Sequence, residues 1–583
     1  MELKKKVRTV LAAGIAAATL FSVAACGGSG NDTASDKDDG SLMTVDVFDS
    51  LANSQGEQKG WYAKLIKDKF NIKLNMIAPN VSGGDTVFDT RSASGNLGDI
   101  VIVGTGNGRL NKLVKAKLIE DMTPYYSSMK NVKKYDSAVK AITEQAGKDG
   151  VWGIPQGVSE QSPTEPSEGL EPASAPYIRW DYYKEIGYPE IKDLDGFLDV
   201  LKQMQDKARE DTGSDDIYAI SLFKDWDGDV MQNAGAICNW FGYQNQGSVF
   251  VSADGKDVQP ATQKDGIYQQ ALQFLNKAEQ MGIVDPDSTT QDWDTMQTKV
   301  TNGKILMSIW SWLGKPRVNG TENKDKTIGF MLAPLQNMNV YSAGFQPNGD
   351  GSTIIALGSK AKNKKRLAEF IDWLYSPEGI YASASNSGGA SCPKDLGCFT
   401  TDEDGKNPTL TDFGSTAMTG DHANLKVDAD KGGSSYDDGF SKLNFKSVSM
   451  NDIDPNTGEA YNPLLWKSNQ DESALFKDWS EHMGGATSDI DYLQKNNQLA
   501  VAAGASYTTP EEDSTVSATR SSIKSEVVNA SWQAITAKGN FDKTLDEART
   551  KVEELGYKDV LKVDQDNAKG LIKARQEIIK EAK

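Results

Sequence analysis

Short apolar strands alternate with amphipathic helices along most of this chain, and this alternation limits the possible fold more than any other feature. Residues 43–49 alternate in polarity with the period of a strand, and residues 61–70 carry apolar side chains at helical spacing. Ile100–Val103 is a continuous apolar run, which is typical of a buried parallel strand. Strands separated by helices predict an α/β fold with a mostly parallel sheet, in which ligands bind beyond the carboxyl ends of the strands.

The 583-residue chain is too long for one hydrophobic core, so we expect two or three folded units. A second group of alternating elements begins near Tyr177, and the C-terminal residues 521–583 are strongly helical in pattern. Between these points the periodicity predicts helices over 182–186, 197–204, 268–281 and 364–375, and strands over 217–223, 305–309, 328–333 and 353–357.

The first residues have the pattern of an export signal. Met1–Arg8 is basic and Val10–Ala25 is apolar, but the apolar run is shorter than the ~20 residues that a membrane-spanning helix needs. Val23-Ala24-Ala25-Cys26 resembles the bacterial lipobox, whose cysteine is acylated, for example with palmitate. We therefore expect a signal peptide over 1–25 and a lipid anchor on Cys26; the alternative is an ordinary secretory signal. Residues 26–41 contain no aromatic or branched apolar side chain, which predicts a flexible tether.

The charge of the chain limits the classes of partner that it can bind. The formal net charge is −19, which argues against nucleic acid and against an anionic membrane surface. It does not exclude an anionic ligand, because a pocket can be locally basic. The lipid anchor is the only membrane contact that we expect.

The sequence lacks the common catalytic and metal-binding motifs. It has only two histidines and no zinc-protease, paired Cys-x-x-Cys or Gly-x-Ser-x-Gly pattern. The glycine-rich 104–108 fails as a dinucleotide loop because Arg109 stands at the third glycine position. The stretch beginning at Asp452 fails as a calcium loop because Thr457 replaces the required glycine and Pro463 the final glutamate. We expect no enzyme activity, no cofactor and no metal.

Three cysteines remain besides Cys26. Cys392 and Cys398 lie six residues apart in an exported chain, which predicts a small local disulfide; two free thiols are the alternative. Cys238 is expected to be a small buried apolar residue.

A series of short motifs then follows in a recognisable order. The order is similar to that of the family 1 extracellular solute-binding proteins of the maltose- and alginate-binding type. Glycine replaces the proline usual in the first motif, and residues 407–514 fit the family least. The motifs are Gly98–Val101, Leu118–Tyr125, Trp152–Pro155, Tyr177–Asp181, Gly282–Pro286, Gly303–Met307, Trp373–Gly379 and Trp532–Ile535.

The resemblance implies a periplasmic-binding-protein-like fold of two α/β lobes that close over a ligand in the cleft between them. It implies crossings between the lobes near Tyr177–Arg179 and Ala333–Leu335. We expect lobe 1 to comprise 42–176 and 335–388, and lobe 2 to comprise 177–334 and 389–583. The function implied is that of a monomeric receptor that delivers its solute to the permease subunits of a bacterial ABC importer.

Aromatic residues predict that the solute is an oligosaccharide, because sugar rings stack their C–H faces on aromatic rings. Trp310 and Trp312 follow a predicted strand, where the resembling sugar binders place a cleft tryptophan, and Trp240 and Tyr243 lie in a segment that supplies another. Core packing is the alternative for each tryptophan, and we assign the tryptophans at positions 180, 373 and 532 to the core.

Thr105 and Asn107 follow the Ile100–Val103 strand, where the family places contacts from lobe 1. Asn53, Trp226 and Phe345 complete the set of candidate ligand-binding residues. A receptor for a peptide or another solute, a surface adhesin and a secreted carbohydrate-active enzyme stay open as alternative functions.

Overall fold

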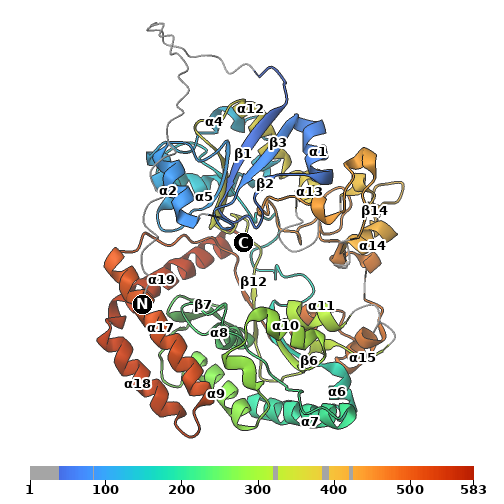
Figure 1. The fold of residues 1–583 in the computed structure, drawn as a ribbon, viewed down its shortest axis with the longest axis vertical. Coiled ribbons are helices and arrows are strands. Elements are labelled where there is room, and N and C mark those ends of the chain that lie inside the picture. Colours follow the sequence, from blue (N-terminus) through green and yellow to red (C-terminus); the bar gives the residue numbers. More distant parts are fainter. Residues whose placement is uncertain are drawn as a thin grey trace, which may run out of the picture. The chain divides into compact units, whose positions relative to one another are not determined.

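The structure is a computed structural model that describes residues 38–82, 84–319, 326–383, 393–418, 424–469 and 471–582. Two β-sheets organise these residues into two parts, which we call lobe 1 and lobe 2 (Figure 1). The contacts within Asp38–Lys583 group both lobes into one folded unit.

Lobe 1 is built on a six-stranded sheet in the order β2-β3-β1-β4-β13-β5. β1 runs parallel to β3 and β4, whereas β13 runs antiparallel to β4 and β5. The prediction of a mostly parallel sheet is confirmed for this lobe, since β1, β3, β4 and β5 run in the same direction. β2 and β13 run the opposite way, and β13 does so because it returns from lobe 2 and enters the sheet at its opposite end. The strands are β1 (Met43–Asp49), β2 (Gly56–Glu57), β3 (Ile72–Ile77), β4 (Ile100–Gly104), β5 (Ile154–Pro155) and β13 (Thr353–Leu357).

Helices cover both faces of this sheet. Along β4, Ile100 and Ile102 point into one apolar core while Val101 and Val103 point into another, as the alternation of side chains on a strand requires. Burial on both faces explains why β4 is a continuous apolar run. The helices of lobe 1 are α1 (Gly60–Phe70), α2 (Gly84–Ala93), α3 (Arg109–Lys115), α4 (Thr123–Tyr126), α5 (Asp136–Ala146), α12 (Lys364–Trp373) and α13 (Pro377–Ser383).

Lobe 2 contains a three-stranded sheet in which β10 (Met307–Trp310) and β11 (Phe330–Leu332) flank β6 (Ser174–Arg179), both antiparallel to it. A small sheet of β7 (Tyr243–Gln246), β8 (Val249–Ser252) and β9 (Val258–Pro260) packs against the last helix. The helices of lobe 2 are α6 (Trp180–Glu185), α7 (Leu194–Thr212), α8 (Gln232–Cys238), α9 (Ile267–Gln280), α10 (Trp293–Thr301), α11 (Ser311–Val318), α15 (Ala474–His482), α16 (Asp489–Lys495), α17 (Ser514–Thr536), α18 (Phe541–Glu554) and α19 (Tyr557–Glu581).

The first part of the segment that fits the family least packs on lobe 1, together with the residues just before it. Its buried residues Phe399, Tyr436 and Trp466 share one apolar core with β1 and α1, and the Trp61 ring stacks on Tyr436 at 5.8 Å between centroids. The expected boundary, which gave all of 389–583 to lobe 2, is corrected here: residues 393–418 and 424–466 belong with lobe 1. This segment holds β14 (Phe399–Thr400), β15 (Thr409–Leu410) and α14 (Asp412–Met418).

Three lengths of backbone meet between the lobes. Residues 156–173 lead from β5 to β6, residues 344–352 lead from β12 (Val340–Ala343) to β13, and residues 503–513 follow β16 (Leu499–Ala502), which pairs with β12. The two expected crossings are not where the chain changes lobes. Tyr177–Arg179 lies within β6 of the lobe 2 sheet, because the chain has already changed lobes before β6 begins, and Ala333–Leu335 directly follows β11 of the same sheet.

Glycines allow these three backbones to touch. The Gly504 N–H donates to the Pro163 carbonyl at 2.8 Å, and the Gly344 N–H donates to the Ala502 carbonyl at 2.8 Å. A Cβ at Gly344 would lie 1.9 Å from the Pro163 oxygen, and one at Gly504 would lie 1.8 Å from the Phe345 oxygen. We call this contact of residues 163–166, 344–345 and 502–504 the hinge crossing.

Most of the expected elements are confirmed, with small shifts at their ends, and the helix expected over 197–204 is longer than predicted, since α7 runs from Leu194 to Thr212. Residues 217–223 form no strand; they make only isolated bridges through Tyr218 and Ile220. The last residues of the expected tether are also held, since Arg366 donates to the Asp38 carboxylate at 2.7 Å. In the part of the chain that the structure describes, no helix is both long and apolar enough to cross a membrane.

Candidate ligand-binding site

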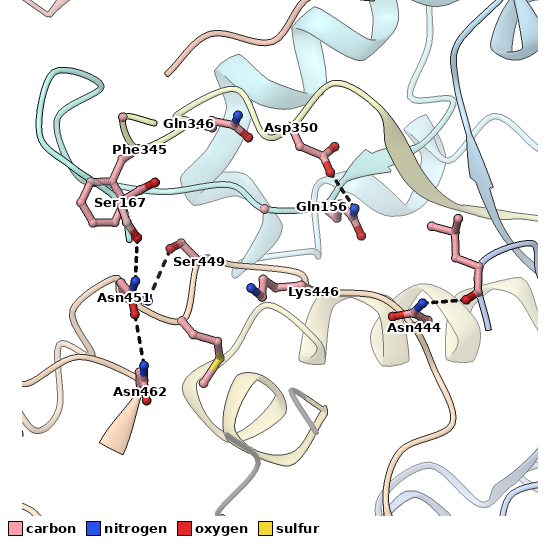
Figure 2. A pocket seen from close by; sticks show the side chains of 14 residues that line it. Gln156, Ser167, Phe345, Gln346, Asp350, Asn444, Lys446, Ser449, Asn451 and Asn462 are labelled. Atoms are coloured by element: carbon pink, nitrogen blue, oxygen red, sulfur yellow. Dashed lines mark hydrogen bonds between the residues drawn. The ribbon is translucent and has the colours of Figure 1, made fainter. Parts of the chain in front are cut away.

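A polar cavity of about 630 Å³ lies at the edge of the lobe 1 sheet, beside the hinge crossing. Amide and hydroxyl side chains dominate its lining, and Figure 2 shows them pointing into the space from several segments. The lining residues are Leu51, Gln156, Gly157, Ser167, Gly344, Phe345, Gln346, Asp350, Asn444, Lys446, Ser449, Met450, Asn451 and Asn462.

The strand order explains the position of this cavity. Leu51 follows β1 and Gln156 follows β5, so both lie at the carboxyl end of their strand. Asp350 precedes β13, which is antiparallel, and therefore reaches the same edge of the sheet. Carboxyl edges are where open α/β sheets bind ligands.

Asp350 fixes the loop that leads into β13. Its Oδ2 accepts a hydrogen bond from the Gln156 side chain at 2.6 Å, and its Oδ1 accepts from the backbone N–H groups of Ser352 and Thr353 at 2.9 and 3.2 Å. These bonds join β5 to β13 at the cavity wall and orient the Gln156 amide (Figure 2).

Asn451 ties the opposite wall to the first crossing. Its Nδ2 donates to the Ser167 carbonyl at 2.6 Å, and its Oδ1 accepts from the Asn462 side chain at 3.3 Å (Figure 2). The 444–462 segment, which belongs to lobe 1, is thereby held against the backbone that leads to lobe 2.

A buried carboxylate supports the floor of the cavity. Asp49, the last residue of β1, accepts hydrogen bonds from the backbone N–H groups of Asn444 at 3.0 Å and Leu51 at 2.9 Å. Asn444 in turn donates from Nδ2 to the Leu51 carbonyl at 2.6 Å. Burial raises the pKa of Asp49 to about 6, although the three backbone donors around it act in the opposite direction.

Lobe 2 presents a cluster of aromatic rings, formed by Phe223 and four tryptophans, which we call the tryptophan cluster. Trp226 stacks on Trp293 with 4.6 Å between ring centroids, and Trp310 stacks on Trp312 at 5.4 Å. The two pairs touch, with Trp226 and Trp312 5.6 Å apart. Trp226 is 41% exposed and Trp312 37%, so the cluster offers aromatic surface to a ligand.

Local backbone structure holds these rings in place. Trp310 ends β10, and the turn into α11 brings Trp312 back against it. Trp293 is the first residue of α10, and its N–H donates to the Asp225 carboxylate at 2.7 Å. Asp227, on the other side of Trp226, accepts from the Trp532 indole at 2.7 Å. The loop that carries Trp226 is therefore anchored on both sides.

The first crossing connects the tryptophan cluster to the cavity. Trp310 pairs with Ser174 at the start of β6, and the Ser311 N–H donates to the Ala173 carbonyl at 3.4 Å. The same crossing supplies Gln156 and Ser167 to the cavity. The cluster thus lies at the edge of lobe 2 where the chain enters from lobe 1.

The structure brings four of the predicted ligand-binding residues to these two places. Trp226, Trp310 and Trp312 form the cluster, and Phe345 lines the cavity. Trp310 is only 6% exposed, so it supports the other rings more than it offers surface of its own.

Trp240 lies elsewhere, and its expected place in the platform is corrected. It is fully buried in the lobe 2 core between Phe197 and Phe274, with ring centroids 6.3 and 6.0 Å away, so it has no face left for a ligand. The expected burial of Cys238 and of the tryptophans at positions 180, 373 and 532 is confirmed.

The remaining candidates also lie outside both places. Thr105 is buried and donates to the Gly351 carbonyl at 2.7 Å, a bond that supports the loop before β13. The Tyr243 hydroxyl donates to Asp257 at 2.6 Å. Asn107 lines a separate hollow beside α17 and α19, and Asn53 is exposed next to Asn80.

Two predicted covalent features cannot be placed. Cys26 and Cys392 lie outside the described residues, and Cys398 is buried in the lobe 1 core. The acyl anchor and the disulfide stay predictions. Among the residues that the structure describes, no group of three acidic, histidine or cysteine side chains is arranged to hold a metal ion.

Trp293 and the whole 444–462 wall of the cavity were not predicted from the sequence. Trp293 carries a local signal, because Asp292 caps α10 by accepting from the Thr295 N–H at 2.9 Å, which fixes Trp293 at the first turn. The cavity wall has little regular secondary structure and no such signal.

Comparison with known proteins agrees with this architecture. The sequence model of the family described as bacterial extracellular solute-binding protein matches residues 52–381. Lipoprotein LipO of Bacillus subtilis (strain 168) is 25% identical over 314 residues, which span 52% of this chain and 57% of that protein. The chain therefore matches little more than half the length of this curated relative.

Two solved structures share the fold over nearly the whole chain. A human-milk-oligosaccharide (HMO)-binding, ABC-transporter-associated solute-binding protein from Bifidobacterium longum infantis is 15% identical with a TM-score of 0.60, covering 92% of this chain and 100% of that one. The substrate-binding protein FusA of S. pneumoniae, in complex with kestose, is 14% identical with a TM-score of 0.56, covering 90% and 99%. At these identities the likeness establishes the two-lobe fold.

Proposed function

Because this chain belongs to the family of bacterial extracellular solute-binding proteins, we propose that it captures an oligosaccharide outside the cell and delivers it to the permease of an ABC importer. It acts by binding and carries out no chemistry on the solute. Cys26 is its lipid anchor, and the capture unit begins near Asp38.

The tryptophan cluster is the observation that carries this proposal. Two rings, Trp226 and Trp312, are each more than one-third exposed although a third and a fourth tryptophan pack behind them. Large apolar rings left open at an anchored position mark a binding surface. The C–H faces of sugars match such rings, and stacking contributes roughly 1–2 kcal/mol per ring by analogy with other aromatic contacts.

The cavity of lobe 1 provides the complementary chemistry. Its amides and hydroxyls match the hydroxyl groups of a sugar, which need directional partners when they leave water. The amides of Gln156 and Asn451 are already oriented by hydrogen bonds within the protein, which reduces the entropy lost on binding.

A ligand held by both regions must be longer than one ring, which favours an oligosaccharide over a monosaccharide. The relatives with this fold include proteins described as binding human milk oligosaccharides and kestose, and this supports the same class of solute.

A thermal-shift screen of the purified protein tests the proposal. A ligand that binds only the folded state raises its stability by RT ln(1 + [L]/Kd), about 2.7 kcal/mol at a hundredfold excess over Kd. We expect at least one member of an oligosaccharide panel to raise the melting temperature, and monosaccharides to have little effect. A shift with peptides and with no sugar would instead identify a peptide receptor on the same scaffold.

A further inference from the structure

The cavity of lobe 1 has two charged side chains in its lining, and they are used differently. Asp350 is committed to the protein: both of its oxygens accept hydrogen bonds, from the Gln156 amide and from the Ser352 and Thr353 backbone. Its charge is spread over these donors, so it holds the loop in place.

Lys446 has no such partner. Its side chain is half-buried, and its ammonium group makes no hydrogen bond or ion pair within the residues that the structure describes. Figure 2 shows the ammonium group pointing into the space between Gln156 and Asn451. Burial lowers the pKa of Lys446, and the Asp350 carboxylate in the same cavity acts in the opposite direction.

A half-buried ammonium group without a hydrogen-bond acceptor is costly unless a ligand supplies that acceptor. The neighbouring backbone holds Lys446 in place, since the Gly157 N–H donates to the Lys446 carbonyl at 2.7 Å. Asn451 and Asn444, on the same segment, are fixed by hydrogen bonds of their own. The group that enters the cavity therefore meets a positive charge at a defined position, with neutral amides beside it and with the Asp350 carboxylate already hydrogen-bonded to Gln156, Ser352 and Thr353.

We propose that the solute is an acidic oligosaccharide and that Lys446 binds its carboxylate in the lobe 1 cavity. This inference rests on the proposed function and names its substrate class. One ammonium group balances one negative charge, which fits the carboxylate of a uronic acid unit. The surrounding amides bind the hydroxyls of the same sugar ring, while the tryptophan cluster of lobe 2 stacks on the rings farther along the chain.

The acidic character of the whole protein makes the local cation more informative. With a net charge of −19, the protein repels anions over the screening distance of ~8–10 Å. The Lys446 ammonium group counteracts this repulsion locally, so it favours negative charge at one position of the ligand only.

Titration calorimetry with matched sugar pairs tests the proposal. The probes are oligomers of galacturonate, glucuronate and mannuronate, each compared with its carboxyl-reduced neutral counterpart of the same length. We expect at least one acidic oligomer to bind about tenfold more tightly than its neutral counterpart, as a charge-assisted hydrogen bond allows. Lys446→Met should remove this difference by weakening the acidic member alone.

Lys467→Met is the matched control. It makes the same change of charge on the same segment, but Lys467 is 84% exposed and lies outside the cavity. This variant should keep the preference for the acidic oligomer. A thermal melt of both variants confirms that they are folded.

The outcomes separate this inference from the proposed function. If a neutral oligosaccharide binds as tightly as its acidic counterpart, or if Lys446→Met weakens both equally, the acidic substrate class is wrong while the oligosaccharide receptor stands. If neither these probes nor the neutral oligosaccharide panel bind, both proposals fail.

Discussion

Replacing Gly504 with alanine tests the hinge crossing. Gly504 lies where three backbones meet, and its N–H donates to the Pro163 carbonyl at 2.8 Å. A Cβ at this position would lie 1.8 Å from the Phe345 oxygen and 2.4 Å from its carbonyl carbon. Both atoms are backbone, so no rotation of a side chain relieves the overlap.

The cost follows from these contacts. A carbon and a carbonyl oxygen need roughly 3.3 Å, so the two backbones must move apart by more than 1 Å. Overpacking of this kind costs about 1–3 kcal/mol, and losing the hydrogen bond to Pro163 adds about 1 kcal/mol. We therefore expect Gly504→Ala to lower the free energy of unfolding by roughly 2–4 kcal/mol. Because Phe345 lines the cavity, ligand affinity should fall as well.

Urea unfolding followed by tryptophan fluorescence measures this loss. Gly106→Ala is the control, because the nearest atom to its added Cβ is the Thr509 hydroxyl at 4.0 Å, which is ordinary contact. If Gly504→Ala and Gly106→Ala both unfold at the wild-type urea concentration, the close contact at the hinge crossing is wrong.

Three further predictions concern single side chains. The pKa of Asp49 is raised to about 6, and protonation removes an acceptor from the Asn444 and Leu51 N–H groups. Ligand affinity should therefore fall as the pH drops through 6, and the Asp49→Asn variant should lose this pH dependence of affinity. Trp240→Ala should destabilise the fold by about 3–5 kcal/mol, because it empties a fully buried site. Cys26→Ser should leave the protein unprocessed or release it from the membrane fraction.

For each of these three predictions there is a result that would contradict it. For Asp49, stability and ligand affinity should change in opposite directions with pH. The pKa of Asp49 in the folded state is above the ordinary 3.8, so protonation favours the folded chain. The contribution of Asp49 to the free energy of unfolding therefore rises as the pH falls from above 6 toward 3.8. Equal pH profiles for wild type and Asp49→Asn would contradict the assignment. A near-native urea midpoint for Trp240→Ala would show that Trp240 is not a core residue, and normal membrane retention of processed Cys26→Ser would exclude the acyl anchor.

The regular parts of the fold could be predicted because their signal is local. In β1 and β3 polar and apolar residues alternate, and β13 is a nearly continuous apolar run, according to which faces of each strand are buried. These patterns can be seen in the sequence alone. The direction of β13 could not be predicted, because it depends on the chain returning from lobe 2. The placement of 393–418 and 424–466 on lobe 1 depends on long-range contacts such as Trp61 with Tyr436, which no local pattern records.

The candidate site was predictable only where a strand end fixes a side chain. Trp310 is the last residue of β10 and Trp312 follows it, so both lie at the carboxyl end of that strand. The burial of Trp240 could not be predicted, because Phe197 and Phe274 reach it from two other helices. Lys446 was not identified from the sequence, because its importance depends on the absence of a hydrogen-bond partner for its ammonium group among the described residues, which no local pattern records.

The affinity of Trp226→Ala for its oligosaccharide tests the central claim most directly. Trp226 is exposed and its loop is anchored by Asp225 and Asp227, so its loss should leave the melting temperature near that of the wild type. At roughly 1–2 kcal/mol per stacked ring, calorimetry should show affinity reduced by about tenfold. Tyr125→Ala, an aromatic truncation outside the cluster and the cavity, should bind as the wild type does. Unchanged affinity of Trp226→Ala in a folded protein would contradict the account.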